Sequence, residues 1–242
     1  PRTAPPCWPA PAPRPSGAPN PRTAGLGGAP ALRGYRSERG DSSIEKGALA
    51  LGFGIEGVVK IPGDDTFAMS VDALEAAIGG DRAAGFVPCA ISATVGTTSS
   101  AAIDPVRQIA AIAKRENAWL HVDAAYAGPA TICPEFRWLW DGIETADSIV
   151  VNPHKWLFTP IDCSVLYTRH PDILRETFSL VPEYLKTTDT AEVNYMDYGL
   201  QLGRRFRALK LWFLFEHYGV AKMQSVIRQH VADATLLSPP RK

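Results

Sequence analysis

The sequence has no run of roughly 18 apolar residues, the length that a transmembrane helix needs. Its first residues also lack the basic and then apolar order of a secretory signal peptide. Neither sign of charge dominates, since 25 lysine and arginine residues balance 25 aspartate and glutamate residues. Because neither a basic stripe nor an acidic tail is present, we expect no nucleic acid and no membrane as partner.

Cysteine is also scarce. The four cysteines are scattered along the chain, at Cys7, Cys89, Cys133 and Cys163. They form no CxxC motif and no pair with metal-ligand spacing, so the sequence predicts no metal site. Thiols dispersed in this way favour a cytoplasmic protein whose cysteines stay reduced.

Residues 1–34 differ from the rest of the chain. They hold ten of the 21 prolines and show almost no aliphatic periodicity, so they can neither continue a helix nor supply many donors to a sheet. One interpretation is a disordered tail or linker. Another is an out-of-frame or misjoined translation of a GC-rich gene, which would give the same composition. We take residues 35–242 as the folded part.

The folded part has the pattern of an α/β protein. Helix starts are predicted where a hydroxyl or a carboxylate precedes an apolar-periodic run, at Ser42, Ser70 and Asp104. A long helix is expected over 203–218 with Gly219 as its C-terminal cap, and another over 220–234. Strands are expected at 89–95, 119–122, 148–151 and 164–168. Their alternation with helices predicts a mostly parallel sheet with right-handed crossovers.

Three of these strands end in polar residues with useful chemistry. Ligands of open α/β sheets bind beyond the carboxyl ends of the strands, and these ends carry Gly96-Thr97-Thr98, Asp123 and Asn152-Pro153-His154-Lys155. Hydroxyls beside a helix start can hold a phosphate. A carboxylate can pair with a protonated ring nitrogen, and a lysine can form a Schiff base with an aldehyde. Together these groups meet the needs of pyridoxal phosphate.

Each of these residues also has an ordinary structural explanation. Asp123 can cap a following helix, and Thr97 and Thr98 can be turn residues. Lys155 is one of eight lysines. His121 alternates with Asp123, and we expect it to face the other side of the strand and to be structural.

Five longer stretches add more specific information: WLHVDAAYAG (119–128), CPEFR (133–137), ADSIVVNPHKW (146–156), DCSVLYTR (162–169) and LGRRFRALKLW (202–212). They resemble group II pyridoxal-phosphate-dependent amino acid decarboxylases, most of all the aromatic-L-amino-acid branch with its plant tyrosine and tryptophan decarboxylases. The likeness runs from about residue 42 to residue 231. It implies an α/β fold, the fold type I large domain of aspartate aminotransferase-like enzymes, present here incompletely and without the small C-terminal domain.

The resemblance implies roles for individual residues. Lys155 would form the Schiff base with pyridoxal 5′-phosphate, Asp123 would keep its ring nitrogen protonated, and Ala125 would pack against the ring face. Further cofactor contacts are implied for four polar residues: Thr98, Ser148, Asn152 and His154. Tyr184 matches a mobile-loop tyrosine that protonates the α-carbon after CO2 leaves. Relatives that form aldehydes typically have phenylalanine there, so Tyr184 favours simple decarboxylation.

Gly203, in LGRRF, matches a small position near the ring pocket of the family. A missing side chain there leaves space for a bulky aromatic substrate. The alternative is a glycine at a helix start.

The chain departs from the family at Asp41, where relatives have a histidine that stacks over the cofactor ring. A carboxylate at this position introduces repulsion toward substrate and phosphate. Asp41 therefore either lowers activity severely or marks sequence damage beside the proline-rich segment.

Three functions are consistent with the sequence. The first is decarboxylation of an aromatic L-amino acid (tyrosine, tryptophan or DOPA type) to the amine and CO2. The second is the same carboxy-lyase chemistry on another acid, such as glutamate or histidine. The third is a truncated, non-catalytic product that binds the cofactor weakly or only pairs with a full-length partner, which Asp41 supports. The family also implies a homodimer, and apolar surface is expected where the family's other regions would cover this core.

Overall fold

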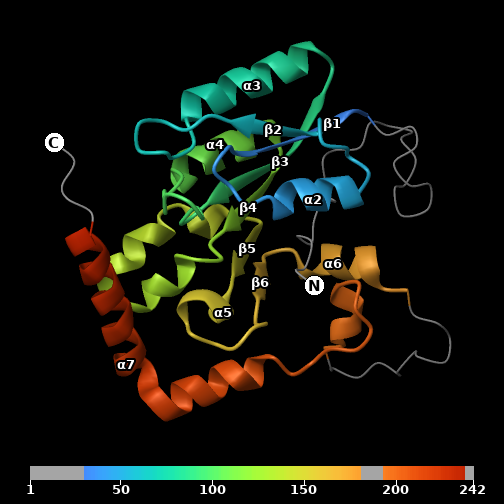
Figure 1. The fold of residues 1–242 in the computed structure, drawn as a ribbon. Helices are drawn as coiled ribbons and strands as arrows, with labels where there is room; N and C mark the ends of the chain where they lie inside the picture. Colours follow the sequence, from blue (N-terminus) through green and yellow to red (C-terminus); the bar gives the residue numbers. More distant parts are fainter. Residues whose placement is uncertain (1–29, 181–192, 238–242) are drawn as a thin grey trace.

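The computed structural model describes residues 30–180 and 193–237, which form a six-stranded sheet flanked by helices (Figure 1). The strands are β1 (Leu32–Ser37), β2 (Val58–Ile61), β3 (Val87–Thr94), β4 (Trp119–Asp123), β5 (Ser148–Val151) and β6 (Val165–Thr168). Their order is β2-β1-β3-β4-β5-β6, and all neighbours are parallel except β5 and β6. The mostly parallel sheet is confirmed, and each of the four predicted strands is present.

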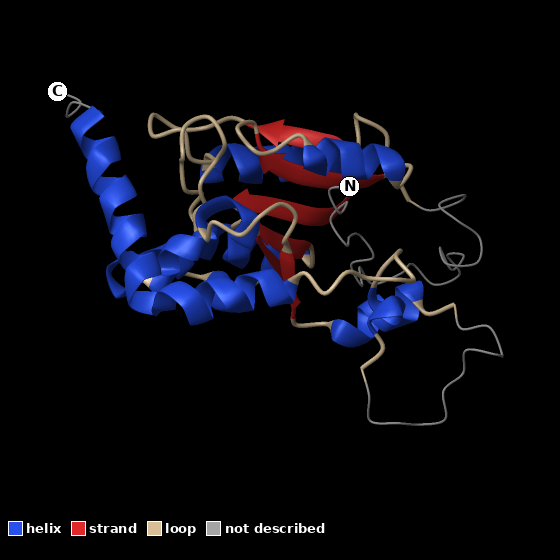
Figure 2. Ribbon diagram, turned by 60° about the horizontal axis from the view of Figure 1, so that its bottom comes forward, coloured by secondary structure: helices blue, strands red, loops and turns tan. Residues whose placement is uncertain are grey.

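Helices cover both faces of the sheet. On one face lie α3 (Val71–Ala83) and α4 (Val106–Glu116), and on the other lie α2 (Ser43–Ala50) and α6 (Pro171–Phe178). Short helical turns make up the connections: η1 (Gly128–Ile132), η2 (Pro134–Trp140), η3 (Ile143–Thr145), α5 (Pro153–Trp156) and η5 (Tyr195–Tyr198). The long helix α7 (Ala208–Leu237) runs along one end of the sheet (Figure 2).

The main core fills the space between the sheet and helices α3 and α4. The apolar face that the sequence predicted for α4 is buried there: Val106, Ile109, Ala110 and Ala113. In the facing strands, Ile91 of β3 and Val122 of β4 are both 0% exposed. Burying an aliphatic side chain of this size stabilises a fold by about 1.5–3 kcal/mol. The core therefore fixes the two central strands.

Asp104 does not cap α4, contrary to the prediction. The N-cap residue of α4 is Pro105, and the Asp104 carboxylate instead accepts the backbone N–H groups of Met69 (2.7 Å) and Thr94 (2.7 Å). Burial raises the pKa of this carboxyl to about 6, although the two N–H donors act in the opposite direction. Asp104 thereby ties the end of β3 to the segment before α3.

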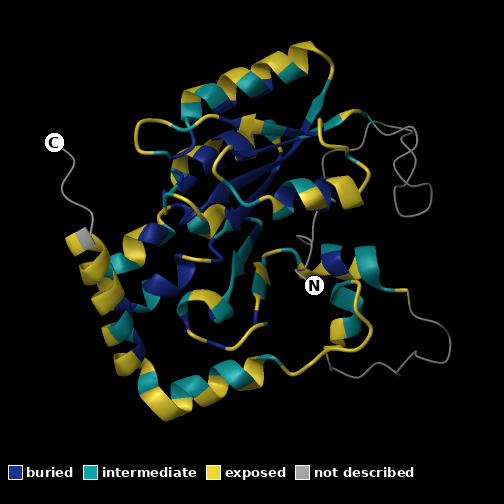
Figure 3. Cartoon of the chain, viewed as in Figure 1, coloured by how far each residue is buried: buried dark blue, intermediate teal, exposed yellow. Residues whose placement is uncertain are grey.

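Helix α7 starts later than predicted. Its interruption at Gly219 lies where the prediction placed the boundary between two helices. The helix begins at Ala208 and not at Gly203, and Leu211 is the first of its residues that packs against the core. Gly219 has a φ of 73° and interrupts the helix. The second half buries Met223 and Ile227 against the core. The first half exposes much of its surface (Figure 3).

Strand β1 begins at Leu32, inside the segment 1–34 that the sequence set apart. Pro30 is the last proline of that segment, so the following backbone is free to pair, and Leu32 lies opposite Val87 of β3. Residues 1–29 lie outside the described residues. Within residues 30–180 and 193–237, no helix combines the length and the apolar character needed to cross a lipid bilayer.

Candidate functional site

The ends of β4 and β5 bring Asp123 and Lys155 to one edge of the sheet. The two strands are parallel neighbours, with Asp123 opposite Val150. Their pairing continues past the strands, because the Asn152 N–H donates to the Ala125 carbonyl (3.2 Å). Lys155 follows three residues later, in α5. The convergence of these strand ends is therefore as predicted.

Asp123 is partly buried and does not cap a helix. Its Oδ1 accepts the N–H of Ala125 (3.1 Å), whereas the N-cap residue of the next helical turn, η1, is Ala127. Its Oδ2 makes no hydrogen bond with any residue that the structure describes. One carboxylate oxygen thus remains available at the sheet edge.

The turn after β3 approaches the turn after β4 closely. Gly96 has a φ of 87°, and a Cβ at Gly96 would lie 2.6 Å from the Cβ of Ala127, so both backbone conformation and space require glycine. Thr97 is buried, and its hydroxyl accepts the Ala102 N–H (2.9 Å). Thr97 is therefore a turn residue. Thr98 is exposed beside it, on the same edge of the sheet as Asp123.

Lys155 stands in a turn that is held from both sides. The Asn152 Oδ1 accepts the Ser164 hydroxyl (2.6 Å). The His154 Nδ1 lies 2.6 Å from the carbonyl oxygen and 3.1 Å from the backbone nitrogen of Cys163. The exposed Lys155 amine makes no hydrogen bond or ion pair with the described part of the chain. Its neighbours are engaged, and the amine is left for another group.

Ser148 is not gathered at this edge. It begins β5, so about 13 Å of extended chain separates it from Asn152. Its hydroxyl oxygen accepts the Trp119 indole N–H (2.8 Å) and lies 2.8 Å from the His121 Nδ1. Ser148 thus serves the buried middle of the sheet.

The expected orientation of His121 is wrong. Alternate residues of a strand share a face, and Trp119 and His121 both reach the hydroxyl of Ser148. His121 therefore lies on the same face as Asp123. Burial lowers the pKa of the His121 imidazole, and the Asp123 carboxylate opposes that shift. Its hydrogen bond inside the sheet agrees with a structural role.

Asp41 lies in the loop that follows β1, at the same edge of the sheet. Its Oδ1 accepts the Ser43 N–H (2.8 Å) at the start of α2. Ser42, the expected cap, makes no side-chain cap bond. The preceding loop is fixed by buried Arg36, whose guanidinium donates to the Gly40 carbonyl (3.0 Å) and pairs with Glu45 (2.7 Å). The carboxylate at residue 41 thus acts on the helix start.

Two expected site residues contribute no described contact. Tyr184 falls within 181–192, outside the described residues. Gly203 lies in the irregular segment before α7, where a Cβ would meet no atom within 4 Å. The helix-start explanation of Gly203 is wrong, and the packing of the described residues does not require glycine there.

Several residues that support the Lys155 turn were missed from the sequence. The Trp156 ring stacks on Tyr126, with centroids 4.9 Å apart and planes 4° from parallel. From the start of α7, Arg207 pairs with Asp162 (2.9 Å), and Lys210 donates to the Pro160 carbonyl (2.7 Å). LGRRFRALKLW contains four basic residues, and nothing in the sequence separates Arg207 and Lys210 from the other two.

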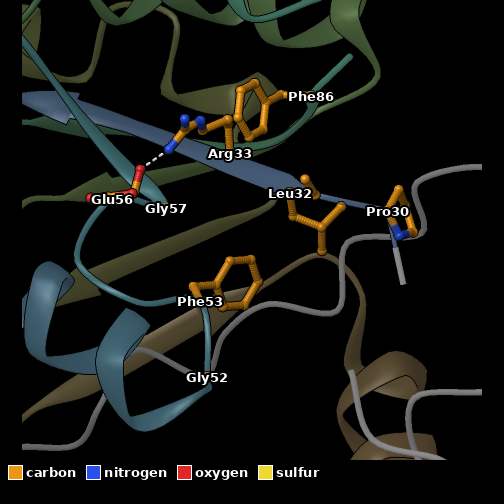
Figure 4. A pocket seen from close by; sticks show the side chains of 9 residues that line it. Pro30, Leu32, Arg33, Gly52, Phe53, Glu56, Gly57 and Phe86 are labelled. Atoms are coloured by element: carbon orange, nitrogen blue, oxygen red, sulfur yellow. Dashed lines mark hydrogen bonds between the residues drawn. The ribbon is translucent and has the colours of Figure 1, made fainter. Parts of the chain in front are cut away.

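A hollow of about 300 Å³ lies at the opposite edge of the sheet (Figure 4). It is lined by the start of β1 and by residues that precede β2 and β3, including Phe53, Glu56 and Phe86. Arg33 crosses it, over the Phe86 ring at 3.8 Å and bonded to the Glu56 carbonyl. Because it adjoins the amino ends of the strands, it is separate from the candidate site.

The groups at the carboxyl edge fit pyridoxal phosphate. A free amine at Lys155 suits its aldehyde, an unengaged oxygen of Asp123 suits its ring nitrogen, and the buried methyl of Ala125 suits a ring face. In residues 30–180 and 193–237, no group of three or more His, Cys, Asp or Glu side chains could hold a metal ion. Cys89, Cys133 and Cys163 are buried free thiols.

Comparisons with known proteins point to the same chemistry. Residues 26–239 match the pyridoxal-dependent decarboxylase conserved domain. Pig (Sus scrofa) aromatic-L-amino-acid decarboxylase is 44% identical over 218 residues, covering 87% of this chain and 44% of that protein. Phenylacetaldehyde synthase of a Rosa hybrid cultivar is 43% identical over 205 residues, covering 83% and 40%.

A solved structure matches the fold. The crystal structure of Oryza sativa TDC with PLP and tryptamine superimposes with a TM-score of 0.84 and 42% identity, covering 88% of this chain and 45% of that one. The chain thus spans about half the length of the relatives that it matches. The domain match covers most of the chain, and the motifs, fold and sheet edge agree with it: the chain belongs to the pyridoxal-dependent decarboxylase family.

Proposed function

We propose that the protein containing this sequence decarboxylates aromatic L-amino acids to amines and CO2 with pyridoxal phosphate. The observation that carries the proposal is the meeting of Asp123 and Lys155 at one edge of neighbouring parallel strands, each with a polar atom left unengaged by the described residues. The aromatic substrate class is supported by the name of the pig relative and by the tryptamine in the rice structure.

Bound pyridoxal phosphate would supply an aldehyde for amines and an electron sink for the bond to the leaving carboxylate. Lys155 would hold the cofactor through its free amine, which makes no hydrogen bond or ion pair with the described residues. Asp123 keeps a proton on the ring nitrogen by placing a fixed negative charge beside it. Ala125 offers the ring an apolar contact. Polar groups of the same edge hold the phosphate: Thr98, Asn152 and His154.

The product depends on where a proton is delivered after CO2 leaves. We assign that delivery to Tyr184, which favours the amine over the aldehyde. Overall similarity does not separate these outcomes, because an aldehyde synthase and a decarboxylase match this chain almost equally well. The identity of residue 184 is therefore the more informative feature.

A second candidate is a protein that binds pyridoxal phosphate without efficient turnover. Asp41 supports it, because its carboxylate lies in the loop at the cofactor edge and is bonded to the start of α2. A negative charge there repels the substrate carboxylate and the cofactor phosphate. Wild-type cofactor binding with no amine product would favour this candidate.

We further propose a homodimer that works in the cytoplasm. Exposed apolar side chains before and within α7 support a covering partner, among them Leu200 (88% exposed), Leu202 (72%) and Phe206 (74%). Free buried cysteines agree with a reducing compartment.

A substrate panel on the intact protein tests the proposed function. L-tryptophan, L-tyrosine and L-DOPA are compared with L-glutamate and L-histidine, and amine, aldehyde and CO2 are measured separately. Amine and CO2 in equal amounts from aromatic substrates alone are expected. Turnover of glutamate or histidine in preference would overturn the substrate class, and aldehyde as the main product would overturn the role of Tyr184.

A further inference from the structure

The start of α7 reaches the loop that follows Lys155, here named the lysine loop (residues 157–164). Arg207 donates from Nε to the Asp162 carboxylate (2.9 Å), with 25% and 35% of the two side chains exposed. Lys210 donates from Nζ to the backbone carbonyls of Pro160 (2.7 Å) and Asp162 (2.9 Å). Two cations, Arg207 just before α7 and Lys210 in its first turn, thus hold three acceptors of the loop.

The other end of the lysine loop is bonded to the cofactor side of the turn. The Cys163 N–H donates to His154 Nδ1 (3.1 Å), the Cys163 carbonyl accepts the backbone N–H of His154 (3.3 Å), and the Ser164 hydroxyl donates to Asn152. Asn152 and His154 lie on either side of Pro153 and directly precede Lys155. A continuous chain of polar contacts therefore runs from α7 to the residues beside Lys155.

The polar contacts of Arg207 and Lys210 fix the position of the lysine loop, and they bury little apolar surface. In the first half of α7, Trp212 is 53% and Phe213 57% exposed and no residue is fully buried, whereas the second half carries the buried Met223 and Ile227. The Arg207 guanidinium lowers the pKa of the Asp162 carboxyl through its hydrogen bond, so Asp162 stays ionised and paired near neutral pH. Charge-assisted hydrogen bonds are the stronger kind and direct their partners.

We propose that Arg207 and Lys210 are positioning residues that hold the lysine loop so that the Lys155 amine meets the cofactor aldehyde. This inference rests on the proposed function. It assigns a task to two cations far from Lys155 in the sequence, neither of which touches it. Small displacements of a reacting group, of about 1 Å, can slow a reaction 100-fold.

Two measurements test the inference on the 242-residue chain. The first follows the rate at which pyridoxal phosphate becomes fixed to Lys155 under borohydride, mapped by peptide mass. The second follows hydrogen exchange at the Leu157 and Cys163 amides, which donate to Pro153 and His154. Arg207→Gln and Lys210→Met are compared with Arg205→Gln and Lys222→Met, whose exposed side chains have no partner among the described residues.

We expect Arg207→Gln and Lys210→Met each to slow fixation at Lys155 about tenfold and to speed exchange at both amides, at temperatures well below the Tm of each variant. The controls should match the wild type, and Arg207→Lys should recover part of the rate. A lower Tm with unchanged fixation would overturn the positioning role. Unchanged exchange would overturn the hold on the loop. A wild-type chain that fixes no cofactor at Lys155 would instead overturn the proposed function, and this inference with it.

Discussion

Asp123 and Lys155 stand at the same sheet edge but are held by different kinds of contact. Asp123 is the last residue of β4. Two other residues of that strand, Leu120 and Val122, are almost fully buried in the main core. Lys155 stands on a single helical turn that receives hydrogen bonds from the Ser164 hydroxyl and the Cys163 N–H. The aspartate half of the site is thus fixed by the apolar packing of its strand, whereas the lysine half combines the packing of Trp156 and Leu157 with hydrogen bonds to the loop that follows it. Changes to each half should therefore fail in different ways.

The largest effect is expected when the charge of the aspartate half is removed. Asp123→Asn should lower turnover by about 100- to 1,000-fold, because a fixed negative charge beside the ring nitrogen is lost. An asparagine Oδ1 can still accept the Ala125 N–H, so the Tm should hardly change. Turnover per bound cofactor and the Tm are measured together. Wild-type-like turnover would remove Asp123 from its assigned role.

The next prediction compares the free energy of unfolding lost at a buried position of the sheet with that lost at an exposed position of α7. Ile91→Ala, at a 0% exposed position in β3, should lower the free energy of unfolding by about 3 to 4 kcal/mol through lost burial and a cavity. Trp212→Ala, at a 53% exposed position on α7, should lower it by about 0.5 kcal/mol. Urea unfolding measures both. Equal losses would show that α7 is packed as tightly as the sheet.

The buried carboxylate of Asp104 should make the sheet region pH-dependent. Its pKa is raised by burial from 3.8 to about 6, so its contribution to stability is complete below pH 3.8 and is lost as pH rises through 6. This corresponds to at most about 3 kcal/mol. The free energy of unfolding of the wild type should therefore exceed that of Asp104→Asn by more at pH 4 than at pH 7. A difference independent of pH would refute the shift.

The smallest effect concerns Asp41. Asp41→His should raise the affinity for pyridoxal phosphate about tenfold, by removing a negative charge and adding an aromatic ring. It should also lower the free energy of unfolding by about 1 kcal/mol, because the Ser43 N–H loses its acceptor. Asp41→Asn is the matched control, since it keeps the acceptor without a ring. Equal gains in both variants would assign the effect to charge alone.

The sequence predicted most of what depends on local periodicity. The strands β3, β4 and β5, the apolar face of α4 and the bend at Gly219 follow from spacing within one element. The meeting of Asp123 and Lys155 followed from the rule that parallel strands share a carboxyl edge.

The errors lie where distant segments compete for a polar group. Asp104 has the sequence of a helix cap, but two buried N–H groups from other segments take its carboxylate. Ser148 matches a family position, yet its hydroxyl is taken by Trp119 and His121. The roles of Arg207 and Lys210 could not be predicted, because their acceptors lie about 50 residues away.

Borohydride trapping tests the central claim most directly. The purified chain is mixed with pyridoxal phosphate, reduced and digested, and the added pyridoxyl mass is mapped by peptide. Because the Lys155 amine is free and its neighbours are fixed, we expect label on Lys155 and almost none on the other seven lysines. Label spread over many lysines, or none at all, would contradict the assignment of a cofactor site to this chain.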